Sequence, residues 1–76
     1  MERHVIVELL TAAETRLAET EAQIWRQREA LVGLLNSSER SEAMRLIETL
    51  QKERLELALG IQRLHDELDS SAAGGG

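Results

Sequence analysis

The chain has 76 residues, one Trp as its only aromatic residue, and no Pro or Cys. This length allows one domain, near the lower size limit for a self-sufficient core. The formal net charge of −5 disfavours binding to nucleic acids and to anionic lipids, because both depend on neutralising phosphate charge. No apolar run approaches the length of a membrane span, so we expect a cytoplasmic protein without nucleic-acid or membrane partners.

Apolar residues at heptad spacing predict a first helix over residues 3–35. The residues that carry this period are Ile6, Leu10, Ala13, Leu17, Ile24 and Leu31. Glu8 interrupts the apolar start of the chain, which argues against an export signal. The pattern is typical of a helix that packs along a partner helix through a narrow seam.

A second apolar ladder predicts a helix over residues 39–69, after a polar turn at residues 36–40 with Ser38 as the expected N-cap. Its seam residues are Ala43, Ile47, Leu50, Leu57, Ile61, Leu64 and Leu68. Because the polar break is short, the two helices must fold back on each other. The sequence therefore predicts an all-α fold, an antiparallel two-helix coiled-coil hairpin over residues 1–69. Residues 70–76, which end in glycines, are expected to be disordered.

Two residues of the second helix are unusual for a seam. Arg54 falls at a seam position between Leu50 and Leu57, where a buried charge would penalise slipped registers. The alternative is an arginine that extends its head group to solvent while its stem covers the seam. Gly60 is expected opposite Leu17, where a bulky side chain would need a small partner, and the alternative is a tolerated surface glycine.

A two-helix seam buries each of its side chains only partly, so a chain of this size is expected to need a second interface. Apolar residues away from the seam are the candidates for it. They are Ala18, Ala22, Trp25 and Val32 in the first helix, and Met44, Leu55 and Leu59 in the second. We expect them to mediate self-association into an antiparallel four-helix bundle dimer, or binding to a helical protein partner. The alternative is that they are scattered exposed side chains without a role.

Metal binding is the one chemical site with a geometric argument behind it. His65 and Asp69 are one helical turn apart, and the expected register places Glu8 near Asp69, so three ligand-type side chains would converge. Charged residues at helix ends are more often simply solvated. No nucleophile is paired with a base by a recognised motif, and no Gly-rich loop precedes a helix, so we expect neither an enzyme nor a cofactor.

These observations predict a non-enzymatic coiled-coil hairpin that acts as a self-associating protein–protein interaction module. The alternative is a small metal- or ligand-responsive regulatory protein built on Glu8, His65 and Asp69. Zinc titration and the mass in solution would distinguish the two hypotheses.

Two segments of the chain carry a family resemblance. They are Ile24-x-Arg26-Gln27-Arg28-Glu29-x-Leu31-x-x-Leu34 and Ser41-Glu42-Ala43-x-Arg45-Leu46-Ile47-x-Thr49-Leu50. With the later Arg63-Leu64 and Glu67-Leu68 they make residues 14–68 resemble a group of small uncharacterised helical proteins of rhizobia and related alphaproteobacteria. The turn departs from that group, whose members tend to have Gly followed by Asp-Thr. The resemblance implies a bacterial helical hairpin and no particular activity.

Overall fold

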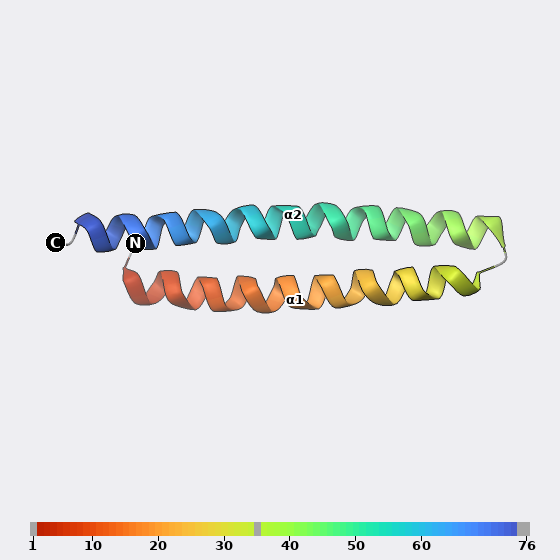
Figure 1. The fold of residues 1–76 in the computed structure, drawn as a ribbon, viewed down its shortest axis with the longest axis horizontal. Helices are drawn as coiled ribbons and strands as arrows, with labels where there is room; N and C mark the ends of the chain where they lie inside the picture. The colour runs from red at the N-terminus through yellow and green to blue at the C-terminus, as the bar shows by residue number, and fades with distance from the viewer. Residues whose placement is uncertain (1, 35, 75–76) are drawn as a thin grey trace.

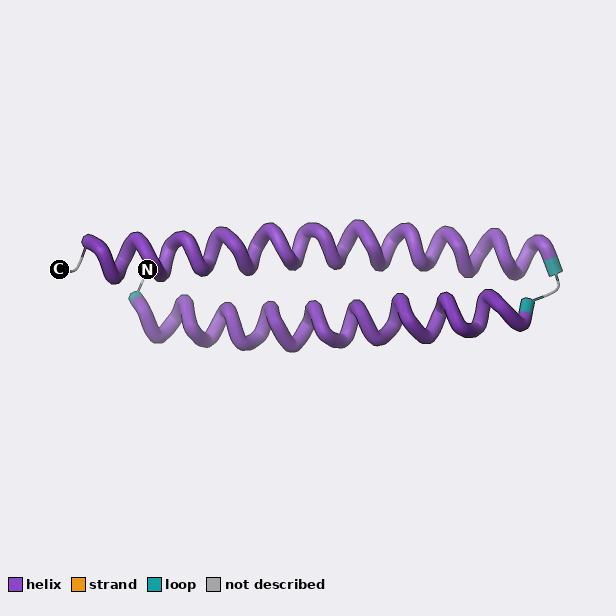
Figure 2. Tube along the Cα trace, viewed as in Figure 1, coloured by secondary structure: helices purple, strands orange, loops and turns teal. Residues whose placement is uncertain are grey.

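The protein folds as two long helices packed against each other. The computed structural model describes residues 2–34 and 36–74. Helix α1 spans Arg3–Gly33 and helix α2 spans Ser37–Gly74. The two run antiparallel, and α2 extends past the start of α1 (Figure 1). Helix covers nearly the whole described chain (Figure 2), which forms a rod of 60 × 14 × 13 Å. The predicted all-α helical hairpin is confirmed.

The core of the hairpin is the predicted seam. Ile6 is fully buried, and the other buried apolar residues are Leu10, Ile24, Ala43, Ile47 and Leu50. The remaining seam residues are half-buried: Ala13, Leu17, Leu31, Leu57, Ile61, Leu64 and Leu68. Thr20, which lies between Leu17 and Ile24 in the heptad period, is also buried. The heptad ladders therefore identify the face through which each helix contacts the other.

The helix ends differ from the predicted bounds. Helix α1 ends at Gly33 rather than at residue 35, and α2 begins at Ser37 rather than at residue 39. Helix α2 also continues to Gly74, beyond residue 70, where a disordered tail was expected to begin. Residues 75–76 lie outside the described part of the chain. Ala is the strongest helix former and Ser is intermediate, so a long preceding helix propagates through them at little cost.

The connection between the helices lies at residues 34–36, earlier than the predicted turn at 36–40. Asn36, not Ser38, caps α2: its Oδ1 atom accepts hydrogen bonds from the backbone N–H groups of Ser38 at 2.8 Å and Glu39 at 3.3 Å. Asparagine is among the strongest N-caps, because its side chain satisfies amides that the first turn leaves free. The earlier cap explains the earlier start of α2.

Arg40 binds the end of α1, on the other side of the connection from the Asn36 cap. Its Nη1 atom donates to the carbonyl oxygen of Leu34 at 3.1 Å and, more weakly, to that of Leu31 at 3.5 Å. These carbonyls lie at the C-terminal end of α1, where the last turn of a helix has unpaired acceptors and a partial negative charge. One arginine from α2 therefore stabilises the end of α1, which the sequence pattern alone did not reveal.

The prediction that the charge of Arg54 is buried in the seam was wrong, because Arg54 is exposed. Arg54 follows Ile47 and precedes Ile61 by seven residues, so it does occupy a seam position of the heptad period. Its exposure agrees with the alternative, in which the head group extends to solvent. The neighbouring Glu53 is half-buried and pairs with Arg16 of α1.

The predicted packing of Leu17 on Gly60 was also wrong. A Cβ atom built at Gly60 would meet no described atom within 4 Å. The surface beside Gly60 is lined from α1 by Ala13. Ala13 and Gly60 are both small, so the seam is not filled where these two residues lie.

Candidate functional site

The three candidate metal ligands do not come together. Among the described residues no group of three or more His, Cys, Asp or Glu side chains lies close enough to hold a metal ion. His65 instead has its Nε2 atom 3.9 Å from Oε1 of Glu14, and both side chains are more than half exposed. Glu8, His65 and Asp69 therefore do not form the expected cluster, and the geometric basis of the metal-responsive alternative is absent from this part of the chain.

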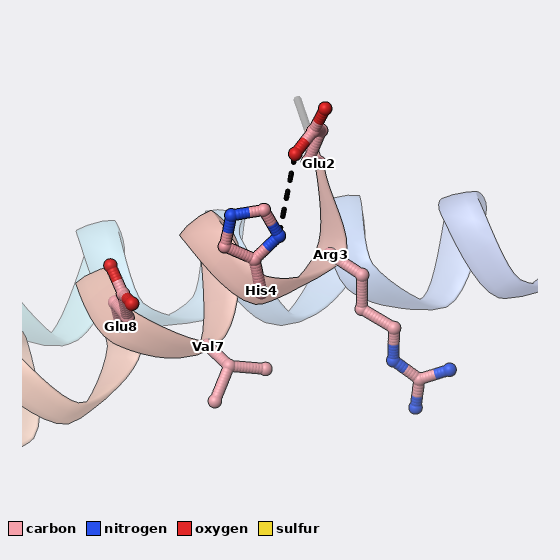
Figure 3. Close-up of a pocket in the computed structure, with 5 residues that line it drawn as sticks. All are labelled: Glu2, Arg3, His4, Val7 and Glu8. Atoms are coloured by element: carbon pink, nitrogen blue, oxygen red, sulfur yellow. Dashed lines mark ion pairs between the residues drawn. The ribbon is translucent and has the colours of Figure 1, made fainter.

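A shallow pocket at the start of α1 is lined by Glu2, Arg3, His4, Val7 and Glu8 (Figure 3). His4 and Glu2 form its one polar contact, with Nδ1 of His4 3.3 Å from Oε2 of Glu2. Arg3 and Val7 point away from this pair in the figure. All five side chains come from the N-terminal end of one helix, so no second element closes the pocket or aims a group into it.

A second groove runs beside Gly60, with a volume of about 550 Å³. It is lined by apolar and charged residues, which are Ala13, Glu53, Glu56, Leu57, Gly60, Arg63 and Leu64. Nothing in it pairs a nucleophile with a base.

The shortest ion pair between the helices joins Arg16 of α1 to Glu53 of α2. The Nη2 atom of Arg16 donates to Oε1 of Glu53 at 2.7 Å, and its Nε atom donates to the same oxygen at 3.2 Å. The hydrogen bond to Glu53, followed by the attraction of its charge, raises the pKa of Arg16 above its usual value. The pair bridges the two helices beside the seam. It is an exposed structural contact rather than a reactive one.

The largest unexplained feature is apolar surface on the sides of the helices away from the seam. We call it the outer face, and it consists of Ala18, Ala22, Trp25, Val32, Met44, Leu55 and Leu59. All seven residues are exposed; Trp25 is 63%, Val32 85% and Leu55 60% accessible. Large aromatic and aliphatic side chains are costly to leave in water, and contiguous patches of them mark interaction surfaces.

The α1 and α2 parts of the outer face lie on one side of the hairpin near the turn. Arg28 is one helical turn after Trp25, and it lines the same shallow pocket as Met44 of α2. Leu55 follows Met44 by eleven residues, close to three full turns, and therefore lies on the same side of α2. Val7 is a further exposed apolar residue on this side of α1, about three turns before Ala18. It was not among the residues predicted for the second interface.

Comparison with family models, with curated proteins and with solved structures gives no match to this chain. Neither helix, over the described residues, is long and apolar enough to cross a membrane. The surface of the hairpin is therefore the basis for a proposed function.

Proposed function

We propose that the protein is a non-enzymatic interaction module whose outer face binds a second copy of the chain, forming a four-helix bundle dimer. The main support for this proposal is that the seam buries a narrow stripe of apolar residues while the outer face leaves others exposed. Trp25, the only aromatic side chain, is more exposed than buried although it is the largest apolar group available for a core.

The size of the core supports the same proposal. Only six apolar residues are buried among those that the structure describes. Chains of this length gain further stability from disulfides, metals or oligomerisation, and this chain contains no Cys. Association through the outer face would bury Trp25, Leu55 and their neighbours in the manner of the second layer of a four-helix bundle.

The intrinsic fluorescence of Trp25 tests the proposal, because no other residue contributes aromatic emission. If a second copy covers the ring, the emission shifts to shorter wavelength and acrylamide quenching falls as the protein concentration rises. Emission typical of a solvent-exposed indole at all concentrations would contradict the proposal.

Two variants make the fluorescence experiment specific. Leu55→Glu places a charge on the outer face, so we expect Trp25 to remain exposed up to concentrations at least tenfold higher than in the unaltered chain. Leu9→Glu is the control, since Leu9 is an exposed leucine outside the outer face and gains the same charge. It should leave the concentration dependence unchanged. Equal effects of the two variants would show that added charge, rather than the outer face, controls association.

A further inference from the structure

The charges of the hairpin are distributed unevenly along its length. The open half, residues 2–21 and 55–70, carries nine carboxylates and three arginines, a net charge of −6. The turn half, residues 22–54, carries five carboxylates and six basic side chains, a net charge of +1. The antiparallel packing of α1 and α2 brings these segments to opposite ends of the rod (Figure 1).

This distribution discriminates between the two ways in which two rods can lie side by side. If both turns are at the same end, the two open halves, each with a charge of −6, lie together. If the turns are at opposite ends, each open half lies beside a turn half of charge +1. Charges within about 8–10 Å of each other interact despite salt screening, so the second arrangement avoids the strongest repulsion.

The sizes of the outer-face residues point the same way. Trp25 follows Ala18 by seven residues and Ala22 by three, so a bulky residue and two small ones alternate along one stripe of α1. With both turns at one end, Trp25 would face Trp25 and Ala18 would face Ala18. The distance between packed helices depends on the side chains at the contact, so a Trp25 pair would hold the helices apart where an Ala18 pair would leave a gap. With the turns at opposite ends, each Trp25 ring faces the small alanines of the other copy.

We propose that the second copy docks on the outer face with its turn at the opposite end of the bundle, so that Trp25 of each copy packs on Ala18 and Ala22 of the other. This inference rests on the proposed function and adds the orientation and the central contact of the dimer. The two-fold axis crosses α1 near Ala22.

A distance measurement between the two turns tests the orientation. The chain has no Cys, so Ser38→Cys provides one site for a spin label per copy, and the exposed Ser38 side chain is not part of the Asn36 cap. The turn is about 13 residues from Ala22, roughly 20 Å along a helix, so the two labels are expected roughly 40 Å apart. With both turns at one end the labels would be within roughly 25 Å, given the packing distance of helices.

A size exchange tests the central contact. Ala18→Trp places two indole rings opposite each other in the proposed dimer and should weaken association at least tenfold. Adding Trp25→Ala to the same chain restores one large and one small residue at the contact, so the double variant should associate again. Failure of the second substitution to restore association would overturn the Trp25–Ala18 contact. Helical circular dichroism of each variant shows whether the hairpin itself has remained folded.

The outcomes separate this inference from the proposed function. A label distance near 40 Å in a dimer supports both. A dimer with a distance below 25 Å, or with both distances present, overturns the orientation and leaves self-association intact. A chain that stays monomeric in the unlabelled form overturns both.

Discussion

Ile24 and Trp25 are neighbours in the sequence, yet their side chains are 3% and 63% exposed. Ile24 lies on the face of α1 that α2 covers, and Trp25 lies on the outer face. The hairpin alone buries Ile24. It leaves most of Trp25, the largest apolar side chain of the protein, in solvent. The intrachain seam therefore explains one apolar face of α1, and the proposed binding of a second copy would explain the other.

The largest expected effect is on the seam. Ile24→Ala removes three carbon atoms from a buried site, and we expect it to lower the free energy of unfolding by about 2 to 4 kcal/mol. Urea unfolding followed by circular dichroism measures this loss. It should be present at every protein concentration, because the contact is within one chain. A loss below about 1 kcal/mol would show that Ile24 is not a core residue.

The matched change on the other face is Trp25→Ala. We expect it to reduce stability only at concentrations where the unaltered chain is associated, because association stabilises the folded chain by mass action. The same urea experiment at two concentrations a hundredfold apart measures the difference. A loss that is equal at both concentrations would place Trp25 within the intrachain core and remove the contrast with Ile24.

Asn36→Ala should cost about 1 kcal/mol, since two backbone N–H groups of α2 lose their acceptor. Ser38→Ala is the control, because Asn36 bonds to the backbone of Ser38 and not to its side chain. It should change the stability by less than about 0.5 kcal/mol. Thermal unfolding of the two variants distinguishes the caps. A larger loss for Ser38→Ala would restore Ser38 as the N-cap.

The smallest effect is expected at Gly60, and it is stabilising. Gly60→Ala adds a methyl group where nothing described lies within 4 Å, and it removes the helix-destabilising freedom of glycine. We expect a gain of about 0.5 to 1 kcal/mol in the free energy of unfolding. A loss would mean that a second copy or another partner approaches this backbone closely.

The heptad spacing was sufficient to predict the hairpin and its buried face. Ile6, Leu10 and Ile24 in α1 and Ile47 and Leu50 in α2 are all where the period places them. The reason is physical: a seam of period seven is the one stripe that stays in contact along two packed helices. The spacing also predicted that the residues of the outer face would lie off the seam.

The predictions that were wrong concern single contacts, which the heptad spacing does not determine. Arg54 is exposed although it occupies a heptad position, and Glu53 beside it pairs with Arg16. Asn36 rather than Ser38 caps α2, so that helix begins earlier than expected. Gly60 lies near Ala13 rather than opposite Leu17, and Glu8, His65 and Asp69 do not form a cluster. A hydrophobic pattern does not resolve the register of two helices to within one turn.

The mass of the unaltered chain in solution tests the central claim most directly. Sedimentation equilibrium over a range of concentrations should show a transition from the 8.5 kDa of one chain to twice that mass as concentration rises. This result would show that the chain self-associates, as the proposed binding of a second copy to the outer face requires. A mass of 8.5 kDa at every concentration, with Trp25 exposed throughout, would contradict the account.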